Sequence, residues 1–331
     1  MSELRVSTDW SYRGLRIISL ENRLLRLDIM PEAGAKIWQI VYKPQDTGLL
    51  WNNPRIPPAR HPLKSCYDDL WSGGWDELFP NDEVAAIEGE NYPDHGELWT
   101  GEWAAETFSS ADEIGVTLRF TTPISSIHVE KQIVLQPDSA QARFHHRFTN
   151  CTSAAFPFLW KLHPAFKVSP QHRLDFPPMK VELEPAFPGT LTGMPAQFDW
   201  PHARNGARSV DLRRIPSPSE RQLYFFYGTQ IKEGWCALTN TATGVSCGLH
   251  FDPKVFQSCW LFATYGGWRN YNVAVIEPCT GYPLNFEAMR AAGRQHVLAA
   301  GESLETEVLF TVQEGIHAVS GIDADGKMVP A

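Results

Sequence analysis

Alternation of apolar and polar residues with a period of two is the feature of this sequence that most restricts its fold. Such alternation places every second side chain on one face of an extended strand, so that face can be buried while the other is solvated. Clear runs occupy residues 25–29, 116–121 and 304–312. Only residues 285–292 combine helix formers with a following glycine, Gly293, that is typical of a helix end. We therefore predict an all-β protein, a large antiparallel β-sandwich with few short helices.

The distribution of glycine and proline, with no linker in the sequence, favours one domain. Its 331 residues include 24 glycines and 25 prolines, which divide the sequence into short strands. No repeat, low-complexity linker or abrupt change of charge marks a boundary. Strands alternating with long amphipathic helices are absent from the pattern, which argues against a parallel α/β fold. We expect residues 1–331 to form a single β-sandwich domain.

Charge and cysteine usage restrict the partners. The net charge of −9 argues against binding to nucleic acid or to anionic membranes. The sequence shows neither a signal peptide nor a long apolar run, so we expect a cytoplasmic protein. Its six cysteines are scattered without metal-binding spacing, which favours free thiols in a reducing compartment. We expect no metal, no cofactor, and a monomer or a homodimer.

A first segment with unusual polar residues covers residues 71–80 and 94–97. It is too rich in glycine, proline and acidic residues for a central strand, and it mixes aromatic rings with carboxylates. Sugar sites use that mixture, because rings cover the C–H face of a sugar and carboxylates accept hydrogen bonds from its hydroxyls. Trp75 is either such a ring or a core residue. His95, next to Gly96 in an acidic loop, is a candidate functional residue.

A second segment covers residues 156–166. If residues 159–163 form a strand, Lys161 and His163 project from the same face. Pro164 is expected to end that strand directly after His163. A lone histidine is often a satisfied core residue, but the neighbouring lysine and the strand end favour a functional role.

A third segment covers residues 272–283. Residues 273–276 form a short apolar run typical of a buried strand, and Glu277 follows it, with Pro278 expected to end the ladder. Burying a carboxylate costs several kcal/mol unless it is paired. Glu277 is therefore either part of a salt bridge or capped turn, or a base whose pKa is tuned by a cation. The residues alone leave both open.

In these segments the sequence resembles the aldose 1-epimerase (galactose mutarotase) superfamily. The likeness rests on His95-Gly96 after a glycine-rich loop, on residues 162–166, on Glu277-Pro278 and on residues 298–303 before the last long strand pattern. The four motifs follow the family's order within residues 70–312. The resemblance implies a galactose mutarotase-like super-sandwich with a sugar groove across one of two large antiparallel sheets.

The resemblance also implies an acid–base mechanism that uses no cofactor. Glu277 would take the proton of the anomeric hydroxyl, His163 would protonate the ring oxygen, and His95 would bind near that oxygen or a neighbouring hydroxyl. The ring would open to an aldehyde, rotate about C1–C2 and close as the other anomer. A positioned acid or base typically contributes about 100- to 10,000-fold to such a rate.

One departure concerns substrate binding. The family carries a sugar-contacting arginine shortly before the His-Gly motif, where this chain has residues 72–77. Asp76 or Arg269 is expected to take its place, so the expected substrate-binding residues are His95, Asp76, Lys161, Arg269 and Trp75. The acidic residues of this loop predict a free monosaccharide, neutral or with at most one negative charge, and not a sugar phosphate.

Two other functions remain open on the same fold. One is a carbohydrate-binding protein without catalytic activity. The other is an epimerase or lyase acting on an acidic sugar, with Lys161 or Tyr271 as a possible base. The presence of both His163 and Glu277 favours the aldose 1-epimerase, because binding alone would tolerate many residue types at either position.

Overall fold

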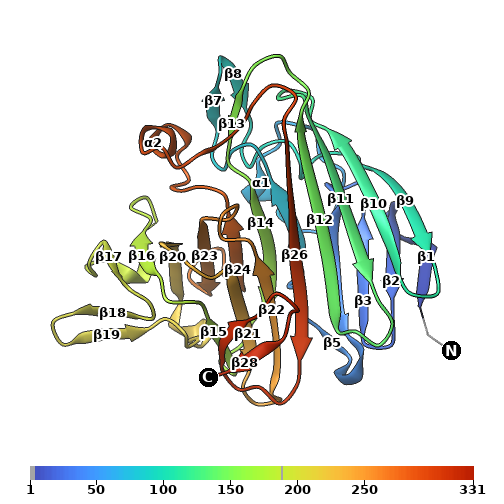
Figure 1. Cartoon of the computed structure of the whole chain (residues 1–331). Helices are drawn as coiled ribbons and strands as arrows, with labels where there is room; N and C mark the ends of the chain where they lie inside the picture. The colour runs from blue at the N-terminus through green and yellow to red at the C-terminus, as the bar shows by residue number, and fades with distance from the viewer. Residues whose placement is uncertain (1–3, 188) are drawn as a thin grey trace. The chain divides into compact units, whose positions relative to one another are not determined.

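Two compact units make up the chain in the computed structural model, which describes residues 4–187 and 189–331 (Figure 1). The first unit contains Met1–Pro164 and Thr280–Glu307, and the second contains Ala165–Cys279 and Val308–Ala331. The single domain expected from the sequence stays a prediction. No helix in the described ranges is long and apolar enough to cross a membrane.

One sheet of the first unit carries most of the candidate residues. Its strands lie in the order β1-β2-β3-β4-β6-β14, and each strand pairs antiparallel with its neighbour. Their bounds are β1 (Arg5–Tyr12), β2 (Leu15–Glu21), β3 (Leu25–Met30), β4 (Lys36–Tyr42), β6 (Trp75–Leu78) and β14 (Lys161–Lys167), and β5 (Thr47–Gly48) pairs with β4. Of β14, residues 161–164 belong to the first unit.

A second antiparallel sheet of this unit has the order β12-β11-β10-β9, and these strands lie side by side in Figure 1. They are β9 (Ala104–Ser109), β10 (Ile114–Thr121), β11 (Ile127–Leu135) and β12 (Gln141–Asn150). The smaller elements are the pairs β7 (Ala85–Ile87) with β8 (Glu90–Tyr92) and β13 (Phe156–Phe158) with β25 (His296–Leu298), the helices α1 (Tyr67–Leu70) and α2 (Phe286–Ala291), and the 3-10 turn at Lys43–Gln45.

A buried ion cluster joins the two sheets of the first unit. The Glu77 carboxylate on β6 lies 3.1 Å from Nζ of Lys131 on β11 and 3.0 Å from Nε2 of His146 on β12. Trp160 Nε1 donates to its other oxygen at 3.2 Å. Burial alone would raise the pKa of Glu77, but the neighbouring His146 and Lys131 lower it to about 2. The Glu77 carboxylate therefore stays ionised inside an otherwise apolar interior.

Replacing Glu77 by glutamine is expected to lower the free energy of unfolding by about 3–5 kcal/mol, because Lys131 is then buried without its counter-charge. Urea denaturation measures the change. The exposed Glu305, whose side chain is 67% accessible and pairs with Arg147, is the control, and Glu305→Gln should cost no more than about 1 kcal/mol.

The lowered pKa of Glu77 adds a pH dependence to this stability. A depressed carboxyl pKa contributes stability above the ordinary value of 4.5 and loses it as the pH falls towards 2. The wild-type protein should lose this contribution over that window and Glu77→Gln should not. Equal losses in both proteins would contradict the assignment.

The second unit also consists of antiparallel strands. One set has the order β24-β23-β20-β16-β17 and another the order β15-β21-β22-β26. The bounds are β15 (His172–Asp175), β16 (Lys180–Leu183), β17 (Gln197–Asp199), β20 (Gln222–Thr229), β21 (Trp235–Asn240), β22 (Val245–Phe251), β23 (Ser258–Tyr265), β24 (Asn272–Cys279) and β26 (Ser303–Gln313). Of β26, residues 308–313 belong to the second unit. Two hairpins, β18 (His202–Asn205) with β19 (Arg208–Asp211) and β27 (Val319–Ile322) with β28 (Met328–Pro330), and 3-10 turns at Gly189–Leu191 and Pro218–Glu220 complete it.

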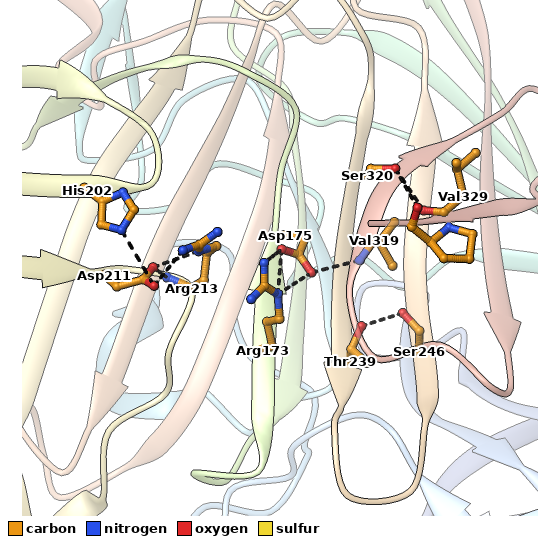
Figure 2. A network of polar contacts seen from close by, with 11 residues as sticks. Arg173, Asp175, His202, Asp211, Arg213, Thr239, Ser246, Val319, Ser320 and Val329 are labelled. Carbon is orange, nitrogen blue, oxygen red and sulfur yellow. Dashed lines mark hydrogen bonds and ion pairs between the residues drawn. The ribbon is translucent and has the colours of Figure 1, made fainter.

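Side-chain contacts fix the strand ends of the second unit (Figure 2). Arg173 donates to both oxygens of Asp175 at 2.9 and 3.0 Å, and Asp175 accepts the backbone N–H of Val319 at 3.1 Å. Thr239 and Ser246 share a hydrogen bond of 2.8 Å between β21 and β22. The buried Asp175 thus holds β27 against β15.

Most expectations about secondary structure are confirmed, but two strand ends are wrong. The expectation that residues 71–80 contain no central strand is also wrong, because Trp75–Leu78 forms β6 between β4 and β14. The three alternating runs lie in β3, β10 and β26, and α2 begins after the N-cap Asn285 and ends before Gly293. However, β14 continues through Pro164 to Lys167, and β24 continues through Pro278 to Cys279. Proline removes one N–H donor, but its carbonyl and its neighbours still pair, as the register of Pro278 with Cys259 shows. The all-β antiparallel fold class is confirmed.

Candidate active site

The candidate residues are distributed over both units. Five lie in the first unit and two in the second: Trp75, Asp76, His95, Lys161 and His163, and then Arg269 and Glu277. The first group can be described as one cluster, because its members contact a common set of residues.

The register of β6 with β14 places Asp76 directly opposite His163. Directly opposed residues of an antiparallel pair point to the same face of the sheet. Trp75 points to the other face, where its ring lies 4.9 Å from that of Phe144 in the core between the sheets. Trp75 is 1% exposed, so we leave it out of the proposed sugar site.

Lys36 on β4 fixes the Asp76 carboxylate. Its Nζ lies 2.6 and 2.5 Å from the two carboxylate oxygens, and it also donates to the carbonyl of Gly73 at 2.9 Å. Gly73 and Gly74 both have positive φ, and a Cβ on Gly74 would lie 2.7 Å from the carbonyl oxygen of Ile37. The Gly-Gly pair thus lets the chain approach β4 closely enough for Lys36 to reach Asp76.

Tyr67, the first residue of α1, connects Asp76 to His163. Its hydroxyl donates to Asp76 Oδ2 at 2.8 Å and lies 3.1 Å from His163 Nδ1. Its backbone N–H donates to Asp94 Oδ2 at 3.0 Å. Tyr67 is 2% exposed and His163 6% exposed, so these contacts are shielded from solvent. Lys36, Asp76, Tyr67 and His163 form one continuous buried chain of polar groups.

The surroundings of His163 disfavour its charged form. Burial lowers the pKa of its imidazole well below 6.5, and the positive charges of Lys161, His95 and Lys36 lower it further. The resemblance assigns His163 the role of acid, which requires a proton that this environment disfavours.

His95 has the opposite surroundings. Its Nδ1 lies 2.8 Å from Asp94 Oδ1, and its ring stacks on Tyr67 with centroids 4.1 Å apart. Burial alone would lower the pKa of His95, but the carboxylates of Asp82 and Asp94 raise it above 6.5. The charged imidazolium is therefore favoured at this position.

Backbone geometry determines where His95 lies. Both His95 (φ +61°) and Gly96 (φ +69°) have left-handed conformations, and a Cβ on Gly96 would lie 2.0 Å from the carbonyl oxygen of Phe79. Only glycine fits the second position. The His-Gly motif is thus explained by a tight turn packed against residue 79.

Lys161 is buried and forms an ion pair with Asp82. Further aromatic rings belong to the cluster: the ring centroid of Trp71 is 5.8 Å from that of His163, and the ring centroid of Trp99 is 5.0 Å from that of Tyr67. The two imidazoles are 6.2 Å apart and nearly perpendicular. The cluster combines aromatic faces, two imidazoles and paired charges, which is the combination that carbohydrate chemistry uses.

The second unit supplies Glu277 and Arg269. Glu277 lies on β24, in register with Trp260 on β23, and is 1% exposed. Arg269 is exposed, has φ +47°, and its guanidinium carbon lies 4.6 Å from the centroid of Trp268. Burying a carboxylate costs free energy unless it is paired. The burial of Glu277 therefore leaves both expectations open, a paired structural carboxylate and a base.

Sequence reasoning missed Lys36 and Tyr67. Lys36 begins the strand at residues 36–42 and occupies a buried position in it. A lysine at a buried position of an apolar strand is the signal that could have identified it. Tyr67 follows a proline-rich loop and carries no comparable signal. Among residues 4–187 and 189–331, no three His, Cys, Asp or Glu side chains are grouped to hold a metal ion.

Comparison with known proteins identifies the fold. No family model matches the sequence. Among solved structures, a protein provisionally named aldose 1-epimerase from Klebsiella pneumoniae is similar with a TM-score of 0.72 and 14% identity, over 94% of this chain and 83% of that one. A galactose mutarotase-like protein from Clostridium acetobutylicum gives 0.68 and 11% identity over 94% and 99%. A provisionally named aldose 1-epimerase from Escherichia coli K12 gives 0.65 and 19% identity over 91% and 100%.

These likenesses place the chain among the large antiparallel all-β proteins. More specifically, its fold is the galactose mutarotase-like fold, as the resemblance implied.

Proposed function

We propose that this protein is an aldose 1-epimerase, which interconverts the α and β anomers of a free sugar by acid–base-catalysed ring opening and closure. The observation that carries the proposal is the pair of imidazoles, 6.2 Å apart, whose surroundings favour opposite protonation states. A mutarotase needs a proton donor at the ring oxygen and a base at the anomeric hydroxyl, and a pair of imidazoles of which one keeps its proton can supply the donor. The galactose mutarotase-like fold supports this choice of reaction.

Glu277 is proposed as the base that takes the proton of the anomeric hydroxyl. This assignment rests on the resemblance and on the burial of a carboxylate that needs a reason to be there. Asp76 serves the site indirectly, because both of its oxygens are engaged by Lys36 and Tyr67. Arg269, in place of the family's arginine, remains a proposed substrate contact.

The charge pattern supports a sugar without a phosphate group. Lys36 is paired with Asp76, Lys161 with Asp82, and His95 with Asp94. A phosphate dianion would compete with these carboxylates for the same cations. Lys161 is also a poor candidate for the base of a lyase acting on an acidic sugar, because its ammonium group is held by Asp82.

Anomer exchange measured by NMR tests the function. The rates for glucose, galactose, a hexuronate and glucose 6-phosphate are compared with and without protein at low ionic strength, after subtraction of spontaneous mutarotation. We expect faster exchange for a neutral or singly charged sugar. Binding without faster exchange for any sugar would instead favour the carbohydrate-binding protein, and the highest efficiency for the phosphate would contradict the substrate class.

A further inference from the structure

We propose that one face of the strands β1, β2 and β3 is a carbohydrate-binding site separate from the candidate active site, where a pyranose unit of a neutral saccharide binds without reacting. This face carries a hollow of about 350 Å³ within the first unit. That volume lies within the range of ligand pockets, about 300–1,000 Å³. The hollow shares no residue with the candidate active site, so the inference goes beyond the proposed function and does not rest on it.

The register of the three strands determines which side chains form the hollow. Directly opposed residues of antiparallel strands point to the same face, and so do residues two apart along one strand. Two adjacent rungs of polar residues therefore share a face: Arg5, Glu21 and Arg26 form one, and Ser7, Ser19 and Asp28 form the other. Ile18, Leu20 and Leu27 point to the opposite face and are buried. One face is thus committed to the core, and the other presents charged and hydroxyl groups.

A β-bulge brings Trp10 to the polar face. Ser7 opposes Ser19 and Trp10 opposes Ile17, so β1 has two residues between these pairs where β2 has one. Without the extra residue, Trp10 and Ser7 would point to opposite faces, because side chains alternate along a strand. Bulges redirect side chains in this way. The bulge therefore adds an indole ring to the face that carries the two polar rungs.

The Trp10 ring offers its surface to a ligand. Trp10 is 62% exposed although it lines the hollow. Ile17, which opposes it, is partly buried and packs against a small apolar cluster of Leu15, Met30 and Ala33. An exposed indole beside hydroxyl and charged groups suits a pyranose, because the ring covers the C–H face of the sugar while the polar groups bind its hydroxyls.

Asp28 supplies an acceptor for those hydroxyls, and Arg26 supplies donors. Ser19 Oγ donates to Asp28 Oδ1 at 2.5 Å, and Arg26 Nε lies 3.3 Å from Asp28 Oδ2. These contacts hold both groups in place, while the side chains of Asp28 and Arg26 remain 16% and 44% exposed. A carboxylate has about four acceptor sites and a guanidinium has five N–H donors, so both retain capacity for a ligand.

The charges of the hollow favour a neutral ligand. Arg5 and Arg26 are balanced by Glu21 and Asp28, and Lys43, which does not line the hollow, pairs with Glu21 at 2.5 Å. Neither sign has a large excess, so a strongly charged ligand gains little attraction. The balance favours a neutral saccharide over a phosphorylated one.

NMR titration of the full-length protein with methyl glucosides, methyl galactosides and trehalose tests the inference. These sugars have no free anomeric hydroxyl and cannot mutarotate, so binding is measured apart from any reaction. In protein with ¹⁵N-labelled tryptophan, Trp10→Phe identifies the Trp10 indole signal among the 12 tryptophans. We expect this signal to shift and saturate with at least one of the sugars. If none of them shifts it, the inference is overturned.

Trp10→Ala should weaken this binding at least about 10-fold, because the surface that covers the sugar is lost. The change is followed at the backbone amide of Ser19, which remains in the variant. Tyr12→Ala is the matched control, since Tyr12 is also an exposed aromatic residue of β1 but stacks on Trp38 and does not line the hollow. It should leave the affinity nearly unchanged, and equal losses in the two variants would contradict the proposed position of the sugar.

Two further results separate this inference from its alternatives. A dimer that forms with rising protein concentration and is lost in Trp10→Ala, without sugar-induced shifts, would overturn the inference in favour of an interface between copies of the chain. Anomer exchange per molecule should be the same in Trp10→Ala as in the wild type. Sugar binding at Trp10 in a protein that accelerates no exchange would overturn the proposed function and leave this inference standing.

Discussion

Glu277→Gln is expected to slow catalysed anomer exchange by about 100- to 10,000-fold, the range that a positioned acid or base contributes. Glutamine has nearly the shape of glutamate but cannot take up the proton of the anomeric hydroxyl. Because Glu277 is 1% exposed on β24, an isosteric change should preserve the packing against β23. Sugar affinity should change much less than kcat.

Polarimetry or exchange NMR, corrected for spontaneous mutarotation, measures this loss. Asp175→Asn is a suitable control, because it is also a buried acid-to-amide change in the second unit (Figure 2). It should lower stability through its contacts with Arg173 and Val319 while leaving the rate per folded molecule unchanged. A rate for Glu277→Gln near that of the wild type would remove Glu277 from the mechanism.

His95→Asn should cause a loss of similar size, about 100- to 10,000-fold, if the imidazole whose surroundings favour the protonated form gives the ring oxygen its proton. Asparagine is the appropriate replacement, since it tolerates the positive φ of this position better than most residues. His163→Asn should cost less, because burial and the neighbouring cations disfavour a protonated ring at this position. The reverse order of the two losses would restore His163 as the acid.

The pH dependence of kcat/KM checks the same assignment. A required imidazolium is present below its pKa and is lost as the pH rises through it. Burial alone would lower the pKa of His95, but Asp82 and Asp94 raise it, so the upper limb should lie above pH 6.5. Asp94→Asn removes one of these carboxylates and should move that limb to lower pH.

The strands were predictable from sequence because burial of one face imposes a period of two that needs no tertiary information. The same is true of the helix at Phe286–Ala291, whose N-cap and following glycine are local signals. The ends of β14 and β24 were not predictable from Pro164 and Pro278. Whether a missing N–H ends a strand depends on the strands that pair with it in the sheet, and the sequence alone does not identify those strands.

The candidate residues with distinctive local chemistry were found, whereas those that support them were not. His95 and His163 stand out beside a glycine and a proline in their own segments. Lys36 and Tyr67 become meaningful only through the register that sets Asp76 opposite His163 and brings β4 alongside β6. Their roles come from partners 40 and 96 residues away, so no local pattern could reveal them.

The pairing of every cation in the cluster with its own carboxylate has a consequence for how a sugar arrives. Three cationic side chains with three carboxylates present no net charge, so the cluster exerts little attraction on a ligand beyond a few ångströms. Encounter is then a matter of diffusion and shape, and added salt has little to screen. A cell could change its ionic strength widely without changing how often this site captures a neutral sugar.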